Sequence, residues 1–173
     1  MKVQELRLQG AKLLSPTLYQ DQRGFFLEAY QLKNYEKVGI CPFVQDNHSY
    51  SKKETLRGLH FQPGQAKLVR VVVGMIYDVI VDIRPESPTF GQWEAIYLDE
   101  KNHCQLYIPH GFAHGFCALT DEAHVLYKVS TFYDPQKERS IRFNDPDFAI
   151  QWPVKHPLLS KRDETAPFFR DIT

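Results

Sequence analysis

The chain has 173 residues, 43% of them hydrophobic, which is enough to bury the core of one compact domain spanning residues 1–173. Lysine plus arginine equal aspartate plus glutamate at 21 each, so no overall positive field draws the protein to nucleic acid or to an anionic membrane. The three cysteines form no Cys-x-x-Cys pair, and no segment has the apolar length of a signal peptide or a membrane span. We therefore expect a soluble, cytoplasmic protein that holds any anionic ligand by local placement of side chains.

The first element predicted in chain order is a short helix over residues 29–38. On this helix Tyr30, Tyr35 and Val38 can share one face. Gly39 follows and can adopt the left-handed conformation that ends a helix.

Short strands dominate the rest of the chain. Residues 67–84 are rich in β-branched side chains, and after Gly74 they alternate Asp78 and Asp82 with valine and isoleucine, the pattern of a half-buried strand. Further strands are predicted at 92–98, 104–108, 114–119 and 124–131, with turn-forming residues between them. Repeated prolines after residue 145 predict that the C-terminal tail wraps over the strands as short turns. Regularly spaced short strands indicate a sandwich or a barrel.

Residues 43–62 concentrate polar, aromatic and histidine side chains just before the longest apolar run. There His60 stands between Leu59 and Phe61, so an extended backbone points its imidazole away from both apolar neighbours. An imidazole that lines a barrel interior can take a proton near neutral pH. A core histidine satisfied by hydrogen bonds is the alternative, and this pattern alone does not separate the two.

A second cluster, IPHGFAHGF at residues 108–116, carries His114 on a predicted strand after a turn. Barrels of the cupin type bind iron, manganese or zinc through histidines and a carboxylate. Such a site requires two histidines one residue apart, whereas the positions flanking His60 at that spacing are Gly58 and Gln62. The spacing argues against a metal, although His110 close to His114 leaves that alternative open.

A third cluster, VLYKVSTFYDPQKERSIRFNDP, runs from residue 125 to residue 146. Tyr127, Val129, Thr131 and Tyr133 share one side of an extended segment, which suits either packing or a polar site. Taken singly, the charged residues of the following ERSIRFNDPD are expected on the solvated surface.

In their order, these clusters resemble the dTDP-4-dehydrorhamnose 3,5-epimerase family over nearly the whole chain. The resemblance rests on six ordered segments: DQRGFFLEAY (21–30), VQDNHSYSKKETLRGLHFQ (44–62), KLVRVVVGMIYDVIVDIRPESPTFGQW (67–93), IPHGFAHGF (108–116), YKVSTFYDPQKERSIRFNDPD (127–147) and LSKRD (159–163). It implies an all-β, cupin-like antiparallel barrel, or jelly roll, with short helices in the N-terminal region and in the C-terminal tail. It also implies an enzyme that needs no metal and no cofactor, and a homodimer in which N-terminal segments reach the partner's site.

The same resemblance implies a substrate, dTDP-4-dehydro-6-deoxy-D-glucose, whose C4 ketone acidifies the hydrogens on C3 and C5. By matched motif, His60 is the base and Asp163 is the carboxylate that orients it. Tyr127 is the acid on the opposite face of the sugar, and Lys67 stabilises the enolate oxygen. Both carbons then invert to give dTDP-4-dehydro-L-rhamnose.

The resemblance also implies a set of residues that bind the sugar nucleotide, with arginines suited to a diphosphate and tyrosines to the thymine base. Tyr19 is expected from the neighbouring subunit. The set is Tyr19, Arg23, Glu28, Gln45, Asn47, Arg57, His114, Tyr133, Glu138 and Arg162.

Two departures from the family pattern concern local contacts. His110 stands where family members often have glutamate, and the loop after Gln62 is short. The remaining alternatives are a relative that inverts only C3 in an antibiotic-sugar pathway and, more distantly, a metal-dependent cupin or a non-catalytic sugar-nucleotide binder.

Overall fold

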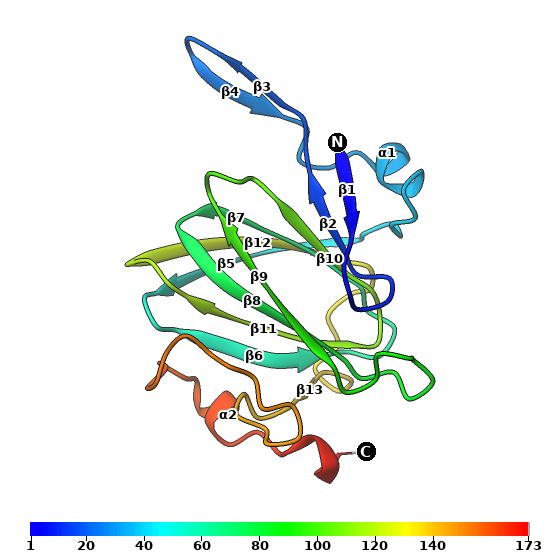
Figure 1. Ribbon diagram of the computed structural model, residues 1–173, viewed down its shortest axis with the longest axis vertical. Coiled ribbons are helices and arrows are strands. Elements are labelled where there is room, and N and C mark those ends of the chain that lie inside the picture. Colours follow the sequence, from blue (N-terminus) through cyan, green and yellow to red (C-terminus); the bar gives the residue numbers. More distant parts are fainter. Residues whose placement is uncertain (173) are drawn as a thin grey trace.

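The computed structural model describes residues 1–172, which form two facing antiparallel sheets and a two-stranded arm (Figure 1). One sheet has the order β1 (Lys2–Glu5), β2 (Lys12–Ser15), β10 (Gln105–Ile108), β7 (Lys67–Val73), β12 (Glu122–Val129) and β5 (Gln45–Lys52). The other has the order β13 (Arg139–Ser140), β6 (Leu56–Phe61), β11 (Phe112–Ala118), β8 (Met75–Asp82) and β9 (Trp93–Asp99). The predicted strands are therefore confirmed within about two residues at their ends. The one at 124–131 ends earlier than expected, at Val129.

The main core fills the space between the two sheets. Inward-facing side chains alternate along each strand, so that Val69 and Val71 of β7 meet Ile76 and Ile80 of β8 in one buried cluster. Burying side chains of this size stabilises the fold by about 1.5–3 kcal/mol each.

Residues 67–84 form two strands, because Gly74 breaks the run with a φ of +80°. A Cβ at this position would lie 2.1 Å from the Glu122 carbonyl oxygen, so only glycine fits the turn. The half-buried pattern predicted for the second strand is wrong, since Asp78 and Asp82 are both 0% exposed. The C-terminal tail covers the outer face of β8, packing Phe148 and Ile150 against its valines, and thereby buries both faces.

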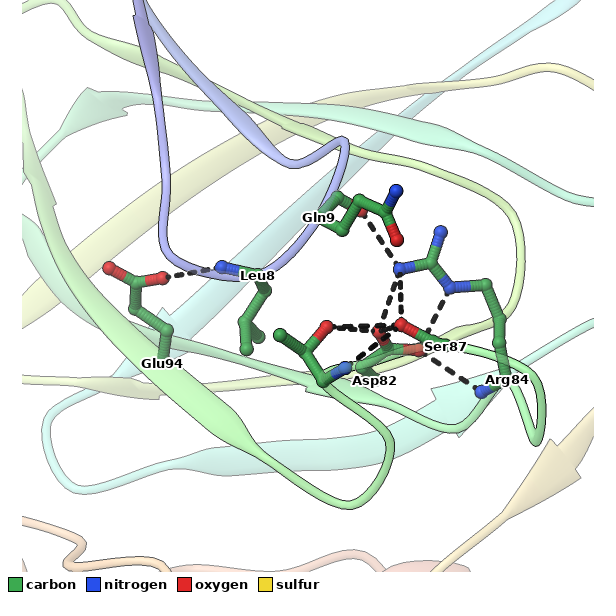
Figure 2. A network of polar contacts seen from close by, with 7 residues as sticks. Leu8, Gln9, Asp82, Arg84, Ser87 and Glu94 are labelled. Carbon is green, nitrogen blue, oxygen red and sulfur yellow. Dashed lines mark hydrogen bonds and ion pairs between the residues drawn. The ribbon is translucent and has the colours of Figure 1, made fainter.

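Asp82 anchors one end of the barrel through a hydrogen-bond network (Figure 2). Its carboxylate accepts bonds from Arg84 Nη2 at 2.6 Å, Ser87 Oγ at 2.5 Å and Thr89 Oγ1 at 2.6 Å. Burial opposes the charge, but these donors outweigh it and lower the pKa of Asp82 to about 2. Arg84 also donates to the Gln9 carbonyl oxygen, so the network ties the loop after β8 to the N-terminal turn.

The helix predicted over residues 29–38 is shorter: α1 spans Leu32–Glu36. Gln31 is its N-cap, and Gln31 Oε1 accepts a bond from the Asn34 amide at 2.8 Å, which leaves the preceding residues outside the helix. Tyr30, Tyr35 and Val38 still pack in one cluster, and Gly39 has the expected left-handed φ of 77°.

Two further segments extend from the sheets. The arm, β3 (Leu18–Asp21) and β4 (Gly24–Leu27), projects away from the barrel and exposes its aromatic side chains (Figure 1). The C-terminal tail runs along the outside of the five-stranded sheet as short turns, with α2 (Lys161–Glu164) and the 3-10 helix η1 (Phe169–Asp171), as predicted. No helix among residues 1–172 is long and apolar enough to cross a membrane.

The expectation that the charges of residues 138–147 are all solvated is wrong for Asp145. This carboxylate is 0% exposed and accepts hydrogen bonds from the Phe169 amide at 2.6 Å and the Asp147 amide at 2.9 Å. It therefore fastens η1 to the start of the tail.

Candidate active site

A cavity of about 450 Å³ opens between the inner faces of the two sheets. Strands β5, β7 and β12 line it from one side and β6 and β11 from the other, while α2 and the segment after β12 complete the wall. The structure brings together here most of the residues predicted for the site: Gln45, Asn47, Arg57, His60, Lys67, His114, Tyr127, Tyr133, Glu138, Arg162 and Asp163.

His60 and Asp163 form a hydrogen-bonded pair in this cavity. His60 Nε2 lies 2.6 Å from Asp163 Oδ1, and Ser160 Oγ donates to Asp163 Oδ2 at 2.7 Å. Burial of Asp163 opposes its charge, but the bonds from His60, Ser160 and the Gly58 backbone outweigh burial and lower its pKa. Because Nε2 holds the carboxylate, Nδ1 is the His60 nitrogen that remains to exchange a proton with a ligand.

A second histidine–carboxylate pair lies on the neighbouring strand. His114 is the cross-strand partner of His60, and its Nε2 lies 2.9 and 3.0 Å from the two Asp78 carboxylate oxygens. Burial lowers the pKa of His114, against the opposing attraction of Asp78, so the ring is neutral at neutral pH.

Lys67 and Tyr127 face the same cavity from adjacent strands of the six-stranded sheet. Among residues 1–172, neither the Lys67 ammonium nor the Tyr127 hydroxyl has a hydrogen-bond partner, so both are available to a ligand. Burial lowers the pKa of Lys67 to about 8 and raises that of Tyr127. At pH 7 the lysine is therefore a cation and the tyrosine keeps its proton.

Three more charged groups lie in the cavity wall: Arg57, Glu138 and Arg162. Arg57 is fixed by bonds to Ser51 Oγ at 3.0 Å and to the Tyr50 carbonyl oxygen at 2.9 Å. Glu138 and Arg162 form an ion pair. A fixed arginine beside an acid, a base and a cation suits an anionic substrate that undergoes proton transfer.

Comparison with known proteins identifies the kind of enzyme that has this site. The model of one family, dTDP-4-dehydrorhamnose 3,5-epimerase, matches residues 5–171. The chain belongs to the dTDP-4-dehydrorhamnose 3,5-epimerase family. It is 51% identical to a dTDP-4-dehydrorhamnose 3,5-epimerase of Salmonella typhimurium, over 90% of this chain and 88% of that protein. It is also 48% identical to the enzyme of that name from Shigella flexneri, over 99% of this chain and 97% of the other.

A solved structure extends the similarity to three dimensions. The dTDP-6-deoxy-D-glucose-3,5-epimerase of Legionella pneumophila, in complex with dTDP-4-keto-L-rhamnose, superposes with a TM-score of 0.96 at 45% identity. The alignment covers 99% of this chain and 94% of that one. The expected cupin-like epimerase fold is thus confirmed.

Three residues predicted for the epimerase site lie elsewhere in this chain. Tyr19 and Arg23 are on the arm, where Tyr19 is 62% exposed and Arg23 pairs with Asp21 at 2.6 Å. Glu28 follows the arm and accepts a bond from Asn34 Nδ2 at 2.9 Å. None of the three lines the cavity formed between the sheets, and their part in binding stays a prediction.

The cavity also has lining residues that sequence reasoning missed, namely Ser49, Gln65, Phe116, Val129 and Ser160. Ser49 Oγ is buried and has no hydrogen-bond partner within residues 1–172. Its position two residues after Asn47 on an alternating strand was the one signal that could have placed it beside the predicted residues.

The side chains that could ligate a metal are relevant to the alternative of a metal-dependent cupin. Among the described residues 1–172, no group of three or more histidine, cysteine or acidic side chains is placed to hold a metal ion. His110, which left that alternative open, is exposed, whereas His114 is buried and bound to Asp78.

Proposed function

We propose that this cavity inverts C3 and C5 of dTDP-4-dehydro-6-deoxy-D-glucose through enolate intermediates, giving dTDP-4-dehydro-L-rhamnose. The observation that carries the proposal is the placement of three groups around one cavity: a carboxylate-bound histidine, and a tyrosine hydroxyl and a lysine ammonium that have no hydrogen-bond partner in the described part of the chain, residues 1–172. They supply, in that order, the base, the acid and the cation that proton exchange beside a ketone requires.

The reaction begins at His60. Its Nδ1 takes the proton from the carbon beside the C4 ketone, and the electron pair of the C–H bond moves into the enolate. The imidazolium that forms is stabilised by Asp163, whose Oδ1 lies 2.6 Å from Nε2. The Lys67 ammonium stabilises the negative charge on the enolate oxygen.

Inversion requires a new proton on the opposite face of the carbon. Tyr127 lies on the six-stranded sheet, across the cavity from His60 on the five-stranded sheet. Its hydroxyl delivers the proton to the enolate carbon, the phenolate is reprotonated from solvent, and the His60 imidazolium releases its proton to solvent. Burial keeps the Tyr127 pKa above its usual value, so the donor stays protonated at neutral pH.

The remaining lining residues bind the nucleotide. Arg57 and Arg162 present planar donors to the diphosphate, and Tyr133 offers an aromatic face for the thymine base. Gln45, Asn47, His114 and Glu138 complete the contacts to sugar and phosphate.

A second copy of the chain supplies Tyr19, Arg23 and Glu28 in this proposal, so the active form is a homodimer. The arm supports this, because Tyr19, Phe25 and Phe26 are 62%, 55% and 68% exposed on it. Aromatic surface of that extent is characteristic of an interface. The three cysteines are free, which agrees with a cytoplasmic location for the enzyme.

The decisive experiment is proton NMR in deuterated water with dTDP-4-dehydro-6-deoxy-D-glucose. Deuterium at both C3 and C5, with formation of the L-rhamno product, is the expected outcome. Deuterium and inversion at C3 alone would replace the proposal with a C3-only epimerase. An absence of exchange at either carbon would contradict the proposed reaction.

A further inference from the structure

The loop that follows β12 is held by side-chain amides to an unusual extent. Gln62 Nε2 donates to the Phe132 carbonyl oxygen at 3.0 Å and to Thr131 Oγ1 at 3.1 Å, while Gln62 Oε1 accepts a bond from the Asp134 amide at 2.9 Å. Three of the four hydrogen bonds that this amide can make therefore go to residues 131–134.

Two more glutamines complete the arrangement. Gln65 Nε2 donates to the Thr131 carbonyl oxygen at 3.1 Å, and Gln45 Oε1 accepts a bond from the Tyr133 amide at 3.0 Å. Each residue from Thr131 to Asp134 therefore has a backbone group bound to a glutamine side chain. We call Gln45, Gln62 and Gln65 the glutamine clamp.

The glutamine clamp determines the position of Tyr133, because few other contacts hold the Tyr133 side chain. Tyr133 is 52% exposed, and among residues 1–172 its ring and hydroxyl make no ring contact and no hydrogen bond. The backbone of the loop therefore decides where this ring stands in the cavity wall. Gln62 itself is 6% exposed and does not line the cavity, so it can influence a ligand only through the loop.

We propose that Gln62 is a positioning residue, which fixes the Tyr133 ring for stacking against the nucleobase of the substrate. This inference rests on the proposed function. A preordered ring saves the cost of ordering the loop on binding, and this saving appears in substrate affinity rather than in the chemical step. Gln62 stands at the position flanking His60 where a cupin would have a metal ligand. In this chain the Gln62 amide instead holds the loop that carries Tyr133.

The test compares the full-length wild type with Gln62→Met, which keeps the length of the side chain but removes its three hydrogen bonds. We expect KM for dTDP-4-dehydro-6-deoxy-D-glucose and Kd for dTDP to rise about tenfold, which corresponds to about 1.4 kcal/mol. We expect kcat to stay within about threefold, because His60, Lys67 and Tyr127 are untouched. Gln136→Met is the matched control, since Gln136 is an exposed glutamine beside the same loop whose side chain makes no hydrogen bond within residues 1–172.

A double-mutant cycle separates positioning from general loss of structure. In a Tyr133→Ala background, Gln62→Met should change KM by less than about twofold, because the ring through which it acts is gone. Equal effects of Gln62→Met with and without Tyr133, or a wild-type KM in the single variant, would overturn the inference. If the wild type itself neither binds dTDP nor exchanges substrate protons, the proposed function fails, and the inference fails with it.

Two further measurements cover the case in which Gln62→Met does not fold. Thr131→Val removes the hydroxyl that accepts from both Gln62 and Gln65, at 3.1 and 3.3 Å, and should raise KM in the same direction. In any other Gln62 variant that folds but lacks the Oε1 acceptor, hydrogen exchange at the Asp134 amide should accelerate, with or without ligand. An unchanged KM for Thr131→Val together with unchanged Asp134 exchange in such a variant would count against the clamp.

Discussion

Replacing Asp163 with asparagine removes the charge beside His60 and leaves the shape of the pair. The asparagine oxygen can still accept from His60 Nε2 over the 2.6 Å contact, and Ser160 Oγ can still cap α2 through the backbone amide of residue 163 at 3.1 Å. The variant therefore tests how much the carboxylate contributes once the ring is already oriented.

The expected loss can be bounded from this geometry. Two opposite charges about 4 Å apart attract by about 4 kcal/mol at an effective dielectric constant of about 20, which limits the loss to about 10³-fold in rate. Exchanging a charge-assisted hydrogen bond for a neutral one costs about 1 kcal/mol, which sets a lower limit of about fivefold. Because Asp163 is only 3% exposed, we expect a loss near the middle of this range, about 10²-fold.

The assay is deuterium incorporation at C3 and C5 at saturating substrate. His60→Ala should lose more than Asp163→Asn, since the base itself is gone. Asp147→Asn, an exposed carboxylate on the same tail, should exchange at the wild-type rate. Wild-type exchange in Asp163→Asn would refute the role of the pair. Wild-type exchange in His60→Ala would move the base elsewhere, with His114 the first candidate.

Four further outcomes follow from the site. Because burial lowers the pKa of Lys67 to about 8, kcat/KM should fall as the pH rises through about 8, and Lys67→Arg, whose side chain stays charged, should lack this alkaline limb. Tyr127→Phe should still wash deuterium into the substrate but lose net inversion much more strongly; equal loss of both would place Tyr127 in binding. An equimolar mixture of the His60→Ala and Arg23→Ala chains, each inactive alone, should recover about a quarter of wild-type activity if each site uses its partner's arm, and no recovery would argue against that exchange. Activity should survive a metal chelator, and loss of both activity and one bound metal ion per chain would contradict the metal-free mechanism.

Local sequence patterns predicted the barrel and one side of the site. Alternation along an extended segment placed His60 opposite Leu59 and Phe61, and both of these neighbours pack in the cluster under the C-terminal tail. Alternation works there because neighbouring side chains on a strand face opposite sides whatever the rest of the chain does.

The same patterns failed wherever distant segments decide the environment. Asp78 and Asp82 looked solvent-facing because nothing local indicates that their side of β8 faces the barrel interior, where His114 and Arg84 bind them, while the tail covers the valine side. The pairing of His60 with Asp163 spans 103 residues, so it came from the family resemblance and from no periodicity. The glutamine clamp was equally hidden, since its three amides meet one loop from two segments far from it in sequence.

The two histidine–carboxylate pairs show how burial assigns different roles to the same chemistry. The His60 side chain is 25% exposed and that of His114 is 9% exposed, although the two residues are cross-strand partners. A proton on His114 would be buried near Lys67 and His60, and burial with these neighbouring charges lowers its pKa against the attraction of Asp78. His114 therefore suits a neutral hydrogen-bonding role toward the sugar. The His60–Asp163 pair lies instead at the open cavity, and bonds from His60, Ser160 and the Gly58 backbone lower the pKa of the Asp163 carboxylate. The proposed reaction therefore assigns the proton abstraction to this pair rather than to His114.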